Sequence, residues 1–331
     1  MKYYIAIDGG GTKTESVLID ENGHILQYTV RRGCNPMDYG TEDTYSHVCA
    51  VVEELIEKTP GPVAGLYAGI AGLNRIQVDL KTCLSKRFSL GKIRAEADGF
   101  SMISGALGHV DGCGMVCGTG SSLFIRREGK PHRDVGGLGY LIDTGGSGFE
   151  LARDGLKAAY RYLDGRGAYT VLADSMAEAL GKDLYSAFQD IYRGGRSFIA
   201  SLAHVVFEGA STGDEICMEL LDKGAQSLAD LTIAAARYFE SDFTVVMNGG
   251  ILKAYPNYVE AIQRKASPQA HMIYGDTPPV YGGCVEALWD CGILASDKLR
   301  GCFMEDYARL AKVPCLHRKT EGETEVSKCK N

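Results

Sequence analysis

Apolar and polar positions alternate in short segments over the first hundred residues, and this pattern predicts strands followed by helices. An Asn-Gly turn at Asn22-Gly23 joins two apolar segments, which is typical of a β-hairpin. Apolar residues recur at helical spacing over 44–57, which predicts a helix with one apolar face. The expected elements are strands 3–7, 15–20 and 24–30, helix 44–57, strand 63–70, helix 76–88, strand 93–97 and a helix from Asp98.

The pattern then starts again with GCGMVCGTGSSLFIRREGKPHRDV, which predicts a strand, a glycine-rich turn and two further strands. Thr14 and Gly23 are nine positions apart in the first hairpin, and Gly120 and Gly129 are nine apart in the second. Together with the strand–helix alternation that follows, this spacing indicates a duplicated α/β unit.

The remainder of the chain is predicted to be mostly helical at first and then to alternate strands with helices. Residues 146–236 have apolar positions mostly at helical spacing. A strand at 243–247, a glycine turn and a helix from Pro256 are expected next, then a strand at 271–274 and a helix at 284–294. The charged tail after Lys312 has few large apolar residues and is expected to be frayed.

Composition narrows the class of protein. The 331 residues carry a net charge of −7 without a basic stripe, so we expect no nucleic-acid partner. No apolar segment reaches the roughly 18 residues of a membrane span, and no signal peptide precedes the first strand. We therefore expect a soluble, cytoplasmic protein without a membrane partner.

Eleven cysteines are scattered without a CxxC pair, so a zinc site is not indicated. Free thiols in a reducing cytosol explain them best. An iron–sulfur role for some of them remains the alternative.

The segment AIDGGGTKTESVLID places three glycines between two strands, where glycine is otherwise unfavourable. A phosphate-binding P-loop needs a glycine directly before Lys13, and a dinucleotide-binding turn needs one at Thr14; both are missing. Free amides in such a turn bind anions, and Asp8 could hold Mg²⁺ through water. A plain glycine turn is the alternative.

The turn CGTGSS offers the same chemistry from the second half, so two hairpins could hold the phosphates between two domains. A third turn, MNGGIL, joins a strand to a helix, and a ribose or a flat ring could lie against its bare backbone. Each turn alone is a weak signal, but the three in this order are specific.

The segments IDGGGTKTESVLID, VCGTGSS and VVMNGGILK resemble the phosphate-1, phosphate-2 and adenosine motifs of the sugar kinase, heat-shock cognate and actin superfamily. Within it, GCNPMDYG, AGIAGL, ADGF, VGGLGYL and TPPVYGGCVEAL resemble the N-acetylglucosamine kinase-type members of the BadF/BadG/BcrA/BcrD ATPase family. The resemblance covers about residues 3–295 and implies two ribonuclease-H-like domains that close on ATP.

The resemblance implies a domain at 1–110, joined by a C-terminal helix at about 284–312, a second domain at 111–283 and a tail at 313–331. Asp8 is expected to bind Mg²⁺. The residues expected to bind ATP are Gly9, Gly10, Gly11, Thr12, Lys13, Thr14, Gly118, Thr119, Gly120, Ser121, Gly224, Gly249 and Gly250.

Asp98 follows a strand and begins the helix that leads into the second half. A carboxylate placed between the two domains could accept the proton of the attacking hydroxyl. Asp is also a favoured helix N-cap, which is the structural alternative. By resemblance, Asp98 corresponds to the catalytic base of the family and contacts the sugar.

The resemblance also implies sugar contacts from Asn35, otherwise a turn residue before proline, and from the backbone of Gly137, Leu138 and Gly139. The family has tryptophan where this chain has Leu138. A gapless match places Thr144 on the family's sugar-binding aspartate, and a shift by one residue would give that role to Asp143.

We therefore expect an ATP-dependent kinase that acts on the primary hydroxyl of an amino sugar, with N-acetylglucosamine or a related hexosamine as substrate. One alternative is an ATPase that activates a radical dehydratase or reductase through an intersubunit [4Fe–4S] cluster. Another is a sugar-sensing regulator without catalysis. Dimerisation is plausible by resemblance.

Overall fold

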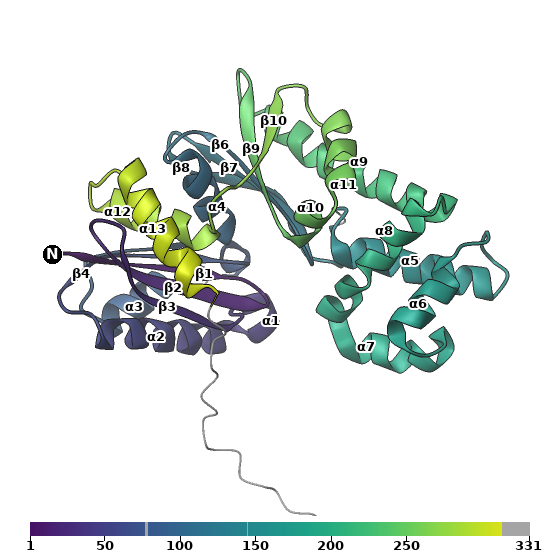
Figure 1. Cartoon of the computed structure of the whole chain (residues 1–331), viewed down its shortest axis with the longest axis horizontal. Coiled ribbons are helices and arrows are strands. Elements are labelled where there is room, and N and C mark those ends of the chain that lie inside the picture. The colour runs from purple at the N-terminus through teal and green to yellow at the C-terminus, as the bar shows by residue number, and fades with distance from the viewer. Residues whose placement is uncertain (77–78, 144, 313–331) are drawn as a thin grey trace, which may run out of the picture.

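The computed structural model describes residues 1–76, 79–143 and 145–312. Figure 1 shows two lobes, each built on its own sheet of five strands. The first lobe holds the N-terminal sheet, and two helices from the end of the chain pack on it. The second lobe holds the other sheet and a long helical region. None of the described helices is long and apolar enough to cross a membrane.

The first sheet has the strand order β3-β2-β1-β4-β5. Its first three strands form an antiparallel meander, whereas β4 and β5 continue parallel to β1. The strands are β1 (Tyr3–Gly9), β2 (Lys13–Asp20), β3 (Ile25–Arg32), β4 (Val63–Ile70) and β5 (Lys92–Glu96).

The second sheet repeats this topology strand for strand. Its order is β10-β9-β6-β7-β8, with β6, β7 and β8 antiparallel and with β9 and β10 parallel to β6. The strands are β6 (Gly112–Cys117), β7 (Ser121–Arg127), β8 (Lys130–Gly136), β9 (Phe243–Asn248) and β10 (Ala270–Tyr274). The predicted α/β class and the duplicated unit are confirmed.

Helices cover both faces of the first sheet, because alternate residues of a strand point to opposite faces. Ile5 and Ile7 pack under α2 (Thr41–Glu57), whereas Tyr4 and Ala6 pack under α12 (Pro279–Asp290). The other helices of this lobe are α1 (Pro36–Tyr39), the 3₁₀ turn η1 (Leu73–Arg75), α3 (Leu80–Arg87), α4 (Asp98–Leu107) and α13 (Asp297–Leu310).

In the second lobe, helices form a separate apolar core beside the sheet. The long helix α9 (Glu215–Ala236) packs on the sheet through Ala225, Leu228 and Ala229. The other helices are α5 (Gly148–Leu163), α6 (Leu172–Leu180), α7 (Leu184–Ser201), α8 (Ala203–Ser211), α10 (Gly250–Ala254) and α11 (Pro256–Lys265).

Three helix predictions were wrong at their boundaries. The helix expected at 76–88 is instead η1 followed by α3, which Asp79 caps. The helix expected from Cys284 begins five residues earlier, because Pro279 is well suited to the first helical position. A break at 291–296 divides the expected segment 284–312 into α12 and α13. The tail, 313–331, lies outside the described residues.

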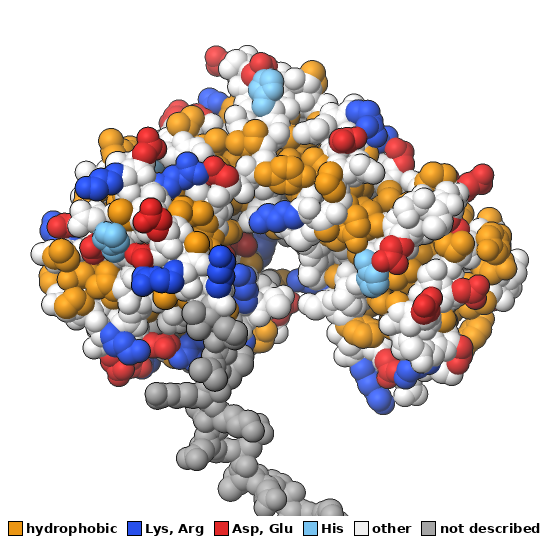
Figure 2. Space-filling view, in the orientation of Figure 1, with side chains coloured by type: hydrophobic (Ala, Val, Ile, Leu, Met, Phe, Trp, Pro, Cys, Tyr) orange, Lys and Arg blue, Asp and Glu red, His pale blue; other side chains and the backbone are white. Residues whose placement is uncertain are grey.

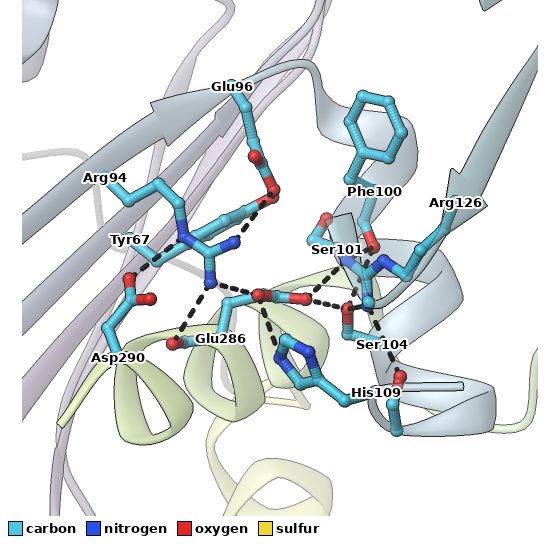
Figure 3. Close-up of polar contacts among 12 residues, drawn as sticks. Tyr67, Arg94, Glu96, Phe100, Ser101, Ser104, His109, Arg126, Glu286 and Asp290 are labelled. Atoms are coloured by element: carbon cyan, nitrogen blue, oxygen red, sulfur yellow. Dashed lines mark hydrogen bonds and ion pairs between the residues drawn. The ribbon is translucent and has the colours of Figure 1, made fainter. Parts of the chain in front are cut away.

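A buried polar cluster lies where the chain passes between the lobes (Figure 3). Glu286 of α12 is fully buried and accepts a hydrogen bond of 2.5 Å from Arg126 of β7. Arg94 of β5 pairs with the same carboxylate, and Nε2 of His109 lies 3.1 Å from it. Since these groups come from both sheets and from the connection between them, the cluster ties the two lobes together.

Candidate active site

The first glycine turn is held tightly by its neighbours. The amide of Gly10 donates to the Lys13 carbonyl at 2.8 Å, and the Gly10 carbonyl accepts from Cys34 at 3.0 Å. Within the described chain, the amides of Gly11 and Thr12 donate no hydrogen bond. These amides are available to an anion, as the sequence predicts for a phosphate-binding turn.

The other residues of this turn differ in their surroundings. A Cβ at Gly9 would lie 2.5 Å from the Cys34 sulfur, so packing requires glycine there. Thr14 is fully buried, whereas Thr12 is exposed. Lys13 donates to Glu15 at 2.7 Å, so its charge is already paired.

The second glycine turn lies against the start of α5. The amides of Gly148 and Phe149 donate to the carbonyls of Gly118 and Thr119, at 2.8 Å and 3.2 Å. A Cβ at Gly118 or Gly120 would meet no atom within 4 Å, so both glycines border open space. Ser121 follows as the first residue of β7.

The third turn packs against the second. Gly249 has a φ of 121°, and a Cβ there would lie 2.0 Å from the Cys117 carbonyl oxygen. Gly250 begins α10 and borders open space. Gly224 of α9 lies close to Gly146, which is near the start of α5: a Cβ at Gly146 would lie 2.2 Å from the Gly224 carbonyl oxygen. These are glycines that the sequence predicts to bind the nucleotide from the second lobe.

Asp8 and Asp98 meet at the carboxyl ends of the first-lobe strands. Asp8 pairs in register with Gly69 of β4, and a Cβ at Gly69 would lie 3.3 Å from the Asp98 Cα. Burial, and next the nearby charges of Asp98 and Glu15, raise the pKa of Asp8 to about 8. Burial also raises the pKa of Asp98 to about 6, with a further contribution from the charge of Asp134. Two half-buried carboxylates thus lie beside the first glycine turn.

The expected sugar-binding residues lie on two loops that contact the segment after β4: a Cβ at Gly72 would lie 2.5 Å from Oδ1 of Asn35, and Arg75 donates to the Gly136 carbonyl. Asn35 is buried and caps α1, accepting a 2.9 Å hydrogen bond from the Met37 amide through Oδ1. The loop after β8 carries Gly137 and Gly139 with positive φ, and Leu138, which is 55% exposed, donates its amide to Asp143. Thr144 lies outside the described residues.

Asp134 was missed by the sequence analysis. It pairs with Phe124 of β7, and the Phe124 ring occupies the place of a Cβ on Gly99, next to Asp98. Since paired residues point to one face, Asp134 faces the start of α4. Asn74 of η1 donates to its carboxylate, and Arg75 lies 3.3 Å from it. A single acidic residue in a polar edge strand carries no motif that could have revealed this.

Figure 2 shows a deep hollow between the first lobe and the helical region of the second. The first glycine turn follows β1 in the first lobe, and the second follows β6 in the other. The arrangement can place an anionic ligand between the two glycine turns, with a carboxylate beside the first. Such a site suits transfer of a phosphoryl group, which needs positioning and charge neutralisation more than covalent help.

Comparisons with known proteins agree with this geometry. The chain is 30% identical, over 69% of its length and 77% of the relative's, to N-acetylmuramic acid/N-acetylglucosamine kinase of Clostridium acetobutylicum. It is 28% identical to N-acetyl-D-glucosamine kinase of Dictyostelium discoideum, over 86% of this chain and 97% of the relative.

Solved structures share the fold. A candidate N-acetylglucosamine kinase from Chromobacterium violaceum superposes with a TM-score of 0.69 at 20% identity, over 86% of this chain and 98% of the other. A glucokinase of the ROK family from Streptomyces griseus gives 0.55 at 20% identity, over 86% and 97%. The model of the BadF/BadG/BcrA/BcrD ATPase family matches residues 5–283, and the chain belongs to this family.

Proposed function

We propose that the chain is an ATP-dependent sugar kinase that phosphorylates the primary hydroxyl of an amino sugar, N-acetylglucosamine or a related hexosamine. One observation carries this proposal: the half-buried Asp98 lies beside Asp8 at the first glycine turn, and the other glycine turns lie in the opposite lobe. The relatives from Clostridium and Dictyostelium are named as kinases of such sugars. Their names favour the kinase over the dehydratase activator considered from the sequence.

Asp98 acts as the general base. Its carboxylate accepts the proton of the sugar hydroxyl while the hydroxyl oxygen forms a bond to the terminal phosphorus and the bond from phosphorus to ADP breaks. A pKa of about 6 leaves Asp98 ionised at neutral pH, yet makes it a better proton acceptor than an ordinary carboxylate.

ATP lies between the lobes in this proposal. The free amides of Gly11 and Thr12 donate hydrogen bonds to phosphate oxygens from one side. The turn of Gly118, Thr119, Gly120 and Ser121 binds the phosphates from the other side. Gly249, Gly250 and Gly224 line the nucleoside. Gly249 packs against Cys117, and Gly224 packs against Gly146.

The donor set fits Mg²⁺, which Asp8 would hold. Asp8 is a half-buried carboxylate whose negative charge is unfavourable beside Asp98 and Glu15, and a cation relieves that repulsion. The described residues contain no group of three or more metal-type side chains. Magnesium takes one or two carboxylates and completes its shell with water and phosphate. When bound, it neutralises phosphate charge.

The sugar site is built from Asn35, Asp98 and the loop after β8. The Oδ1 atom of Asn35 caps α1, so its amide group remains to donate to a sugar hydroxyl. Gly137, Leu138 and Gly139 contribute backbone groups. Asp143 or Thr144 takes the place of the family aspartate.

Three further properties belong to the proposal. The domains are 1–110 with the C-terminal helices of 284–312, and 111–283. The location is the cytoplasm, in keeping with free thiols at the nine cysteines among the described residues. The protein forms a homodimer.

The test is ADP release measured across a panel of hexoses and hexosamines, with Asp98→Asn as the matched variant. We expect release that depends on an amino sugar. Asp98→Asn should lower kcat by about 10²–10⁴-fold while ATP binding is retained. Absence of release with every sugar of the panel would contradict the proposal.

A further inference from the structure

An arginine from the second lobe pairs with a carboxylate that lies beside the first glycine turn. Nη2 of Arg196, in α7, lies 3.8 Å from Oδ2 of Asp38, in α1. Figure 1 shows α1 at the edge of the first lobe that faces α7. The same Asp38 oxygen would lie 3.2 Å from a Cβ on Gly11, and the Tyr39 hydroxyl donates to the Gly11 carbonyl at 3.3 Å. Arg196 is thus one carboxylate away from the phosphate-binding turn.

The backbone before Arg196 has a specialised conformation. Gly195 interrupts α7 with φ of 65° and ψ of −163°, a combination that essentially only glycine adopts. An uninterrupted helix would avoid this cost. The kink in α7 therefore lies immediately before Arg196.

The ion pair is of a kind that exchanges readily. The side chains of Arg196 and Asp38 are 29% and 37% exposed, and pairs this open to water contribute little to stability. A phosphate group, in contrast, matches the guanidinium with two parallel hydrogen bonds. An incoming triphosphate can therefore displace Asp38 as the partner.

The positive charge next to the first turn is paired with a buried carboxylate. Lys13 is the basic residue within it, and its Nζ is paired at 2.7 Å with Glu15, which also accepts from Tyr28 and Tyr307. Burial opposes ionisation of Glu15, but these hydrogen bonds keep its pKa below the usual value. A transferred phosphoryl group is stabilised by positively charged side chains in addition to Mg²⁺.

We propose that Arg196 is a phosphate-binding residue that Asp38 holds in the ligand-free protein and that the terminal phosphate of bound ATP takes over. This inference rests on the proposed function and extends it. Arg196 neutralises charge on the transferred phosphoryl group, and Asp38 competes with the nucleotide for it. The two ends of one ion pair therefore have opposite effects on triphosphate binding.

Calorimetry with AMPPNP and with ADP, each with Mg²⁺, tests the exchange. Arg196→Ala should weaken AMPPNP binding roughly 10- to 100-fold and leave ADP binding nearly unchanged, because only the triphosphate carries the terminal phosphate. Arg196→Lys should restore part of the loss. Asp38→Asn should tighten AMPPNP binding, since the competitor loses its charge.

Arg193→Ala, which removes an exposed charge from the same helix, is the matched control and should change neither affinity. Thermal melts establish that each variant is folded. Equal loss of ADP and AMPPNP binding in Arg196→Ala, or weaker AMPPNP binding in Asp38→Asn, would overturn the inference. Failure of the proposed function is distinguishable, because the wild type would then bind AMPPNP yet release no ADP with any sugar.

Discussion

Asp98 shows how much of a residue's chemistry comes from its neighbours. The side chain is an ordinary carboxylate, but burial and the charge of Asp134 make it a stronger base. Asn74 and Arg75 fix Asp134 in this position from the other lobe. Its basicity therefore depends on both lobes being in place.

The pH dependence of the reaction should report this pKa. A general base must be ionised, so kcat/KM for the sugar should fall as the pH drops through about 6, the pKa of Asp98. In Asp134→Asn the fall should occur at lower pH, because a charge that raises the pKa is removed. Initial rates between pH 5 and 8.5 measure both profiles. An Asp134→Asn profile identical to that of the wild type would show that Asp134 does not act on Asp98.

At this scale the sequence predicted the glycines and Asp98 through their motifs. It could not predict Asp134 or Arg196, because each acquires its place only through a contact with the opposite lobe. The sequence also did not reveal that the two glycines differ in role: packing requires glycine at position 9, whereas Gly118 borders open space.

Among the elements, the three glycine turns determine the shape of the site. Each follows the carboxyl end of a strand, and the second and third touch through Cys117 and Gly249. The turns were predictable because glycine is costly within strands. Helix ends were less predictable: Asp79 and Pro279 moved two boundaries through capping and N1 preferences that the apolar pattern does not contain.

Gly249 and its neighbour offer a matched test of the third turn. Alanine at Gly249 would combine a φ of 121° with a Cβ 2.0 Å from the Cys117 carbonyl oxygen, so Gly249→Ala should lower the free energy of unfolding by about 2 kcal/mol or more. Gly250→Ala has open space and a helical position, so it should leave stability unchanged or raise it. Urea unfolding without nucleotide measures both. Equal stability of the two variants would contradict this account of the turn.

At the scale of the whole molecule, the architecture rests on the repeated sheet topology and on the buried polar cluster around Glu286. The duplication was visible in the sequence because both hairpins have the same spacing. The cluster was not, because Arg94, Arg126 and Glu286 are far apart in the chain and meet only after both sheets have formed (Figure 3).

Removing the charge of Glu286 should destabilise the connection between the lobes. Burial opposes its ionisation, but His109, Arg126 and Arg94 lower its pKa to about 2, below the ordinary value of 4.5. Glu286→Gln removes the carboxylate charge that faces the fully buried Arg126, whereas Arg94 keeps its pair with Asp290 at 2.9 Å. The substitution should cost about 3–5 kcal/mol in the free energy of unfolding at pH 7.

The contribution of Glu286 to the free energy of unfolding should depend on pH. A lowered pKa stabilises the folded state above about pH 4.5, and the stabilisation is lost as the pH falls toward 2. The difference between wild type and Glu286→Gln in urea unfolding should therefore shrink below pH 4.5. Glu219→Gln, which removes one partner of an exposed ion pair, serves as the control. A difference that stays constant down to pH 3 would contradict the assignment.

The most direct test of the whole account is a crystal structure with AMPPNP, Mg²⁺ and N-acetylglucosamine bound together. We expect the phosphates to be contacted by the amides of the turn at Gly11 and of the turn at Gly118, with the primary hydroxyl of the sugar within hydrogen-bond distance of Asp98. A triphosphate bound elsewhere, or a sugar hydroxyl remote from Asp98, would contradict it.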